Sequence, residues 1–259
     1  MKTSKKAIWY LVVRTLLQQK WILAGAFAVL TLTLALAQSD DDRGKKVKDA
    51  GAQSVKAAKV FNEIMQTPDK SIPQDLLEHA KAIAVFPQVI KAAFLVGGEG
   101  GRGVVSRRTK TGWSDPVYFR AGGGSVGPQI GASSTDIVLL FMNDETVDGL
   151  MKDKFELGAE AAVAGGPVGR EAGAGTDALM HAEILSYSRS RGLFAGVNLK
   201  GVVIRPEDDL NRAVYNKSAH ELLRPEKTGS GSSVAGPTFT QTLTRYAPVS
   251  DAEGKSPAK

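Results

Sequence analysis

The stretch "AAFLVGGEGGRGVVSRR" (Ala92–Arg108) decides the fold. It carries Gly98, Gly100 and Gly103 in a GxGxxG pattern, directly after an apolar run typical of a β-strand. In dinucleotide-binding folds this pattern opens a helix whose N-terminal N–H groups hold a pyrophosphate. Here the β-branched, alternating "VVSRR" follows, so no helix begins. The pattern predicts instead a glycine-rich hairpin that joins "AAFLV" to "GVVSR" and places Arg102 at its exposed tip.

The flanking sequence continues in the same way. From Ala82 to Ile204, short apolar and β-branched runs are separated by Gly, Pro, Asp or Asn, which is typical of strands joined by turns. The links are too short for parallel crossovers of about a dozen residues or more. Helical patterns cover Arg43–Gln66, Gln74–Lys81, Glu145–Lys154 and Glu207–Tyr215. The sequence therefore predicts an α+β fold: a strongly curved, mainly antiparallel β-sheet, barrel-like or sandwich-like, with N-terminal and peripheral helices packed against it.

No catalytic constellation passes a check of its structural context. Gly123–Gly127 matches the GxSxG nucleophile elbow, but Pro128 and a stretch without helical period follow Ser125. The chain has no cysteine, and its three histidines, His79, His181 and His220, are isolated. The acidic run Glu207, Asp208 and Asp209 is interpreted as charges at the start of a helix. The sequence predicts a protein that is not an enzyme, with no catalytic residues, no metal and no cofactor.

The N-terminal segment has the features of a secretory signal peptide. Residues 1–37 contain five basic and no acidic side chains, and the sixteen residues Ile22–Ala37 are uncharged and mostly apolar. Ala35-Leu36-Ala37 fits cleavage before Gln38. An uncleaved membrane anchor is the alternative, although the apolar run falls short of the roughly 20 residues that span a bilayer. We therefore expect a periplasmic or extracellular protein with a signal peptide at 1–37, a folded domain at 38–224 and a disordered Gly/Ser/Pro-rich tail at 225–259. Within this tail, "TFTQTLTRY" could pair on a sheet edge.

Removing the N-terminal segment changes the charge of the protein. Five of the 33 Lys and Arg and none of the 27 Asp and Glu lie in residues 1–37, so residues 38–259 carry 28 against 27, a net charge of +1. This leaves no domain-wide positive field for nucleic acid, and any basic patch must be local.

One local patch lies on the helix predicted at Arg43–Gln66. At about 100° per residue its apolar side chains fall on one side and four lysines on the other: Lys45, Lys48, Lys56 and Lys59. A basic amphipathic helix is typical of a membrane-surface element. The other interpretation is that the apolar side packs on the sheet and the lysines are only solvated. Since each lysine near an anionic leaflet contributes about 1 kcal/mol, four give roughly 4 kcal/mol, a Kd near millimolar, so charge alone does not hold the protein on a membrane.

The segment "ILSYSRSRGLFAGVNLKG" (Ile184–Gly201) resembles the signature of the SYLF-domain family, a lipid-binding and actin-regulator-like group. Four more blocks agree in order: "AKAIAVFPQVIKAAFLVGGEGGRGVV", "GPQIGASSTDIVLLFMND", "FELGAEAAVAGGPVGRE" and "RPEDDLNRAVYN". Together they run from about residue 55 to 218. The resemblance implies a non-enzymatic module that binds membrane lipids and, in some members, actin.

With a signal peptide, this copy is identified as a secreted bacterial member whose ligand is an anionic or acyl lipid of the cell envelope. Besides the four helix lysines, the candidate lipid-binding residues are basic side chains near strand ends: Arg102, Arg189, Arg191 and Lys200. We expect such side chains to hold phosphate groups. The alternative is a structural or protein-interaction role in the envelope, in stress or assembly, in which the helix docks on a protein partner.

Overall fold

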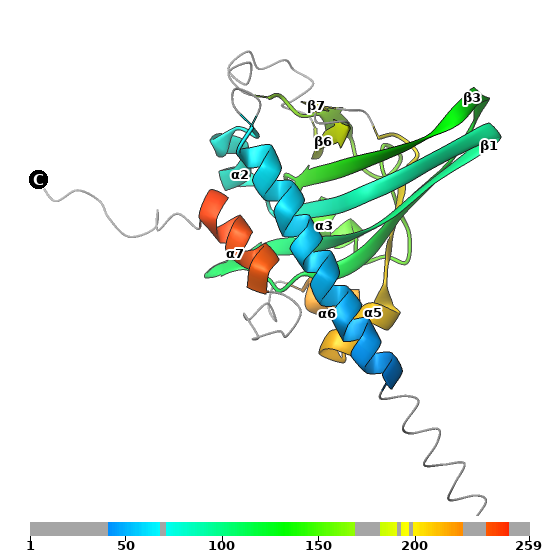
Figure 1. The fold of residues 1–259 in the computed structure, drawn as a ribbon. Helices are drawn as coiled ribbons and strands as arrows, with labels where there is room; N and C mark the ends of the chain where they lie inside the picture. The colour runs from blue at the N-terminus through cyan, green and yellow to red at the C-terminus, as the bar shows by residue number, and fades with distance from the viewer. Residues whose placement is uncertain are drawn as a thin grey trace, which may run out of the picture. The chain divides into compact units, whose positions relative to one another are not determined.

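The structure is a computed structural model that describes residues 41–67, 71–168, 182–190, 193–196, 199–224 and 237–248 (Figure 1). The predicted signal peptide and Arg191 lie outside the described residues. Residues from Lys46 onward form one compact unit, and the description below concerns that unit.

A curled, mainly antiparallel sheet forms the centre of this unit, which confirms the predicted α+β class (Figure 1). Eight strands pair within the described residues: β1 (Ala82–Thr109), β2 (Gly112–Trp113), β3 (Val117–Phe141), β4 (Phe155–Glu156), β5 (Val163–Gly165), β6 (Ile184–Ser190), β7 (Leu193–Gly196) and β8 (Val203–Pro206). β3 pairs with β1 along one edge, and along the other edge with β8 and β6 in turn. Of the described pairs, β5 with β6 is parallel.

The predicted hairpin at Gly97–Gly103 does not exist. β1 is one continuous strand of 28 residues, and its glycines pair with β3 throughout, from Gly98 with Gly124 to Gly103 with Phe119. The chain instead reverses after Thr109, which pairs with Gly112 in β2. Strand β3 is likewise continuous over 25 residues where the sequence indicated separate runs. Arg102 therefore lies in the middle of a strand rather than at a tip.

The glycines of β1 allow two halves of the same strand to approach closely. A Cβ on Gly101 would lie 2.8 Å from Val89 Cγ2. A Cβ on Gly103 would overlap the Phe86 ring and come within 2.6 Å of the Val85 carbonyl oxygen. Residues 85–89 and 101–103 thus face each other across a gap that only glycine fits, because any side chain would collide with backbone. The sheet curls at this point by folding β1 and β3 over together.

The helices lie around the sheet. They comprise the long N-terminal helix (residues 41–65), α2 (Gln74–His79), α3 (Asp144–Gly149), α5 (Asp208–Tyr215), α6 (Ala219–Leu222) and α7 (Pro237–Tyr246). Helix α3 begins one residue earlier than predicted because the Asn143 side chain, rather than that of Asp144, caps it, accepting a 2.7 Å hydrogen bond from the Thr146 N–H.

Both faces of the sheet are buried, each in its own apolar core. On one face, Val85, Tyr118 and Leu140 pack with the long N-terminal helix, including Phe61 and Ile64 of that helix. The other core fills the inside of the curl and contains these fully or almost fully buried side chains: Phe86, Phe119, Phe141, Phe155 and Ile204. The two cores take alternate residues of each strand, which is why the strands read as nearly continuous apolar runs.

Helix α7 lies inside the segment that was expected to be disordered, so that expectation differs from the structure over 237–248. In Figure 1, α7 lies beside the N-terminal helix. The core under that helix contains three fully buried side chains from this segment: Phe239, Leu243 and Ala247. Tyr246 Oη donates a 2.7 Å hydrogen bond to Asn62 Oδ1, and Trp113 Nε1 donates one of 2.8 Å to the Ala247 carbonyl. The piece that could have paired on a sheet edge is therefore a docked helix.

Candidate functional site: a pocket between the N-terminal helix and the sheet

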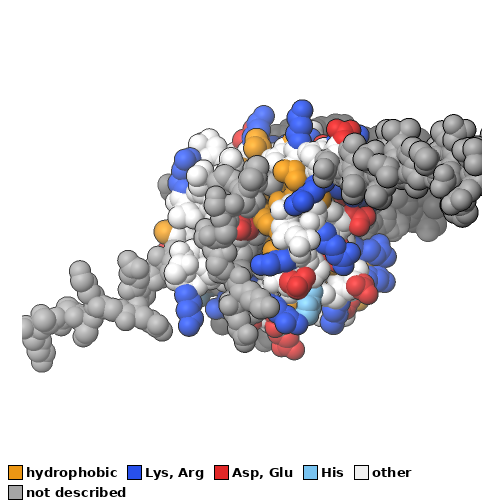
Figure 2. Space-filling model, turned by 90° about the horizontal axis from the view of Figure 1, so that it is seen from below, with side chains coloured by type: hydrophobic (Ala, Val, Ile, Leu, Met, Phe, Trp, Pro, Cys, Tyr) orange, Lys and Arg blue, Asp and Glu red, His pale blue; other side chains and the backbone are white. Residues whose placement is uncertain are grey.

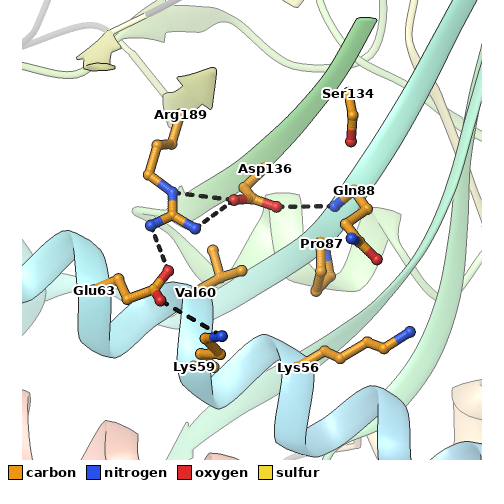
Figure 3. Close-up of a pocket in the computed structure, with 9 residues that line it drawn as sticks. All are labelled: Lys56, Lys59, Val60, Glu63, Pro87, Gln88, Ser134, Asp136 and Arg189. Atoms are coloured by element: carbon orange, nitrogen blue, oxygen red, sulfur yellow. Dashed lines mark hydrogen bonds and ion pairs between the residues drawn. The ribbon is translucent and has the colours of Figure 1, made fainter. Parts of the chain in front are cut away.

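A pocket of about 560 Å³ lies between the N-terminal helix and the sheet, and we call it the helix–sheet pocket (Figure 3). Nine residues line it: Lys56, Lys59, Val60, Glu63, Pro87, Gln88, Ser134, Asp136 and Arg189. Three of them, Lys56, Lys59 and Arg189, are among the lipid-binding residues proposed from the sequence. The fold thus brings two separate stretches of predicted site residues to one place.

An ion-pair network closes one end of the pocket. Arg189 Nε and Nη2 donate to Asp136 Oδ2 at 3.0 and 2.8 Å, and Arg189 Nη1 pairs with Glu63 Oε2. Asp136 Oδ1 accepts a 2.9 Å hydrogen bond from the Gln88 N–H. The sheet register explains the main contact, because Asp136 of β3 and Arg189 of β6 are direct cross-strand partners. Gln88 lies at an irregularity of β1, where its backbone φ angle is 53°, and its N–H is the group that contacts Asp136.

The two carboxylates hold Arg189 in its charged form. Burial alone would lower the pKa of Arg189, but the hydrogen bonds to Asp136 and Glu63 outweigh it, so the pKa lies above its usual value. The Arg189 guanidinium is therefore committed to protein carboxylates, and its role here is to join the helix to the sheet and shape the pocket.

Lys56 and Lys59 are the available charges of the pocket. Both are exposed, and the Lys59 Nζ lies 3.9 Å from Glu63 Oε1 with 75% of the side chain accessible to solvent. Lys56 makes no hydrogen bond or ion pair with any of the described residues. Figure 3 shows these lysines on the helix side, with the polar side chains of Gln88 and Ser134 on the sheet side. Two ammonium groups opposite an amide and a hydroxyl suit an anionic group with several acceptor oxygens.

The other predicted site residues lie elsewhere. Lys45 and Lys48 are exposed on the same helix, and Lys200 is exposed beside β8. Arg102, in mid-strand, pairs with Glu207. Arg191 lies outside the described residues, so its assignment stays a prediction.

Two further arginines near strand ends act within the fold. Arg107 is buried and donates to Asp144, Asp148 and the Leu223 carbonyl, at 2.6, 2.8 and 2.8 Å. Arg108 stacks on the Trp113 ring at 4.3 Å, and its Nη2 and Nε donate to the Leu77 and Ala80 carbonyls at the end of α2. These contacts tie helices to the sheet and leave neither residue for a ligand.

Sequence reasoning missed the carboxylates that partner the arginines. Glu63 could have been noticed, since it follows Lys59 by four residues on the same helical face. Asp136 carries no local signal, because only the register pairs it with Arg189. The acidic run at 207–209 was interpreted as helix-start charges; this holds for Asp208 and Asp209 in the first turn of α5, but Glu207 is buried and pairs with arginines of the sheet.

The described residues contain no cluster of His, Cys, Asp and Glu suited to a metal ion. No helix among residues 41–67, 71–168, 182–190, 199–224 and 237–248 is long and apolar enough to cross a bilayer. Figure 2 shows basic side chains spread over the face seen from below, with acidic ones between them. On that face, positive charge is local rather than continuous.

The fold is thus a curled, mainly antiparallel sheet covered by a long basic helix, with a polar pocket between the two. Residues 122–246 match the family Ysc84, described as Las17-binding protein actin regulator. Residues 122–246 are therefore similar to the Ysc84 (SYLF) family, which the sequence blocks also resemble, and the matched range extends to the end of α7. The family's description is that of a binding and regulatory protein rather than a catalyst.

Relatives in animals and fungi are similar to this chain. The chain is 36% identical over 171 residues to human "SH3 domain-containing YSC84-like protein 1", covering 63% of this chain and 50% of that protein. It is 35% identical over 175 residues to "LAS seventeen-binding protein 3" of Saccharomyces cerevisiae, covering 66% of this chain and 37% of that protein. The chain thus spans half or less of the length of these relatives.

Proposed function

We propose that this domain is a non-catalytic module that binds anionic lipid head groups at a membrane surface, through Lys56 and Lys59 at the helix–sheet pocket together with Lys45 and Lys48 on the same helix. The observation that carries the proposal is the state of the helix. Its apolar face is buried, with Phe61 and Ile64 fully inaccessible, while its lysines are exposed. Val55 is the one large apolar side chain that residues 41–65 expose, so the helix has no continuous apolar face to insert, and binding is electrostatic.

The expected strength follows from the number of charges. About 1 kcal/mol per lysine gives roughly 4 kcal/mol for the four lysines, a Kd near millimolar. An anionic group that enters the helix–sheet pocket adds hydrogen bonds from Gln88 and Ser134 to the lysine contacts. Binding of this kind is peripheral, weak for a single domain and sensitive to salt.

The location belongs to the same proposal. Residues 1–37 have the composition of a signal peptide, which supports a secreted domain that meets the anionic lipids of a bacterial envelope. A structural or protein-binding role in the envelope is the alternative.

Flotation of residues 38–259 with liposomes tests this function. Both apolar cores fall between Ala50 and Ala247, so this fragment retains them. We expect co-flotation that increases with the anionic lipid content and decreases at high salt. Absence of flotation at every lipid composition and salt concentration would contradict lipid binding and favour the protein-binding role.

A double variant tests the residues. Lys56→Glu with Lys59→Glu removes about 2 kcal/mol of attraction and adds repulsion, so the partition coefficient onto anionic liposomes should fall roughly 30-fold or more. The matched control is Lys110→Glu with Lys217→Glu, which changes the net charge equally at two exposed positions off the helix. Equal losses in the two double variants would mean that net charge, rather than the pocket, governs binding.

A further inference from the structure

Three arginines form a row across three neighbouring strands. Arg102 of β1 is the direct cross-strand partner of Arg120 of β3, and Arg120 is the direct partner of Arg205 of β8. Directly opposed residues project from the same face of a sheet with their Cβ atoms about 4.5–5.5 Å apart. Like charges in this arrangement repel, so a row of three needs negative charge beside it.

The protein supplies only part of that charge. Glu207 is buried, and its Oε1 accepts from both Arg102 and Arg120, the latter at 2.6 Å. The hydrogen bond to Glu207 is the main cause that raises the pKa of Arg120. Arg205 is exposed and makes no hydrogen bond or ion pair with any described residue. Glu207 therefore balances one of the three positive charges.

Two more carboxylates lie nearby at the start of α5. Asp208 is directed to other partners: its Oδ1 accepts a 2.8 Å hydrogen bond from the Ala219 N–H, and its Oδ2 lies 3.8 Å from Arg212 Nη2. Asp209 is exposed and adds to the field at Arg120 without a hydrogen bond to the row. Guanidinium N–H groups of the row thus remain directed to solvent.

An open pocket of about 570 Å³ adjoins the row. Arg120, Gly122, Val203 and Arg205 line its sheet side. The carboxylates of Glu207, Asp208 and Asp209 line the side at the start of α5. The next cross-strand row on the same face of the sheet is Gly100, Gly122 and Val203, so its first two positions have no side chain. A Cβ on Gly122 would meet nothing nearer than the Glu99 carbonyl oxygen at 3.5 Å. A ligand can therefore lie on bare backbone beside the arginines without displacing a side chain.

We propose that the row Arg102, Arg120 and Arg205 binds the phosphate group of a ligand, at a site separate from the helix–sheet pocket. A guanidinium fork matches phosphate oxygens with two parallel N–H···O bonds, and neighbouring forks can share one phosphate. A phosphomonoester carries about −1.5 to −2 charges at neutral pH, opposite in sign to the charge of the row that Glu207 leaves unbalanced. Arg205 and Arg120 hold the phosphate, and Glu207 positions Arg120 and Arg102.

Calorimetric titration of residues 38–259 with inorganic pyrophosphate tests the site. We expect saturable binding that weakens with salt and that falls at least tenfold in Arg205→Gln. That variant loses no hydrogen bond or ion pair with the described residues, so its unfolding midpoint in urea should equal that of the unchanged protein. The matched control is Arg245→Gln, an exposed arginine of α7, which should bind pyrophosphate normally. Failure of pyrophosphate to bind, together with equal flotation of Arg205→Gln and the unchanged protein, would overturn the proposal.

The source of the phosphate is decided by a second arm. Flotation with vesicles that contain phosphatidic acid presents the same phosphomonoester on a lipid. Loss of this flotation in Arg205→Gln assigns the site to head groups, whereas loss of pyrophosphate binding alone assigns it to a soluble ligand. The double variant at Lys56 and Lys59 should bind pyrophosphate normally. The experiments therefore test the proposal for the helix–sheet pocket and the proposal for the arginine row separately.

Discussion

Gly103→Ala should lower the free energy of unfolding by about 1–3 kcal/mol or more, because overpacking a close contact forces backbone to move. The added methyl would overlap the Phe86 ring and approach the Val85 carbonyl oxygen, and both belong to the opposite half of the same strand. Neither group can move easily, because Phe86 is buried in the core inside the curl and the Val85 backbone is part of the sheet.

Urea unfolding monitored by circular dichroism measures this effect. Gly98→Ala is the matched control, because a Cβ there has ordinary contact with the Gly123 carbonyl oxygen at 3.8 Å. In a strand, alanine is no worse than glycine, so the control should be neutral or slightly stabilising. Equal stability of the Gly103 and Gly98 variants would mean that the two halves of β1 do not pack as described.

The same glycines show what the sequence could predict. Strand propensity, the class of fold and the absence of a helix after Gly103 follow from local pattern, and the structure confirms them. The hairpin did not follow, because glycine favours both a tight turn and a close approach of backbones. Only the contacts of Gly101 and Gly103 with residues more than ten positions earlier distinguish the two, and such contacts leave no mark on local pattern.

The candidate sites likewise contain residues that the local sequence pattern could predict and residues that it could not. The lysines were found because a helix repeats about every 3.6 residues, so one face can be read from the sequence. The pairing of Asp136 with Arg189, and the alignment of Arg102 with Arg120 and Arg205, depend on which residues of distant strands lie opposite each other. A shift of one residue would place these side chains on opposite faces, so register decides the chemistry of both sites.

Helix α7 was missed for a different reason. Its neighbours in sequence are rich in Gly, Ser and Pro, and a single ten-residue helix has little stability by itself. Its structure comes from docking, through Phe239 and Leu243, on a surface formed by the N-terminal helix and the sheet. Tertiary burial therefore overrides a composition that suggests disorder.

Phe239→Ala should consequently have the largest effect among single changes in the C-terminal segment. Truncation of a fully buried phenylalanine costs about 3–5 kcal/mol, a large part of the roughly 5–15 kcal/mol that stabilises a typical domain. If residues 225–259 contributed nothing to the fold, the same change would leave the stability unaltered. Gln241→Ala, at an exposed position of the same helix, is the matched control and should be neutral.

Tryptophan fluorescence distinguishes release of α7 from unfolding of the whole domain. Residues 38–259 contain a single tryptophan, Trp113, whose Nε1 donates to the carbonyl of Ala247 just after α7. Undocking of α7 in Phe239→Ala should expose the indole and shift its emission to longer wavelength at urea concentrations where the circular dichroism of the sheet is still native. Coincident fluorescence and circular dichroism transitions, at a lower urea midpoint, would mean that α7 is part of the cooperative fold. Unchanged transitions by both methods would contradict the docking of α7, because a side chain that is fully buried in the core cannot be removed without loss of stability.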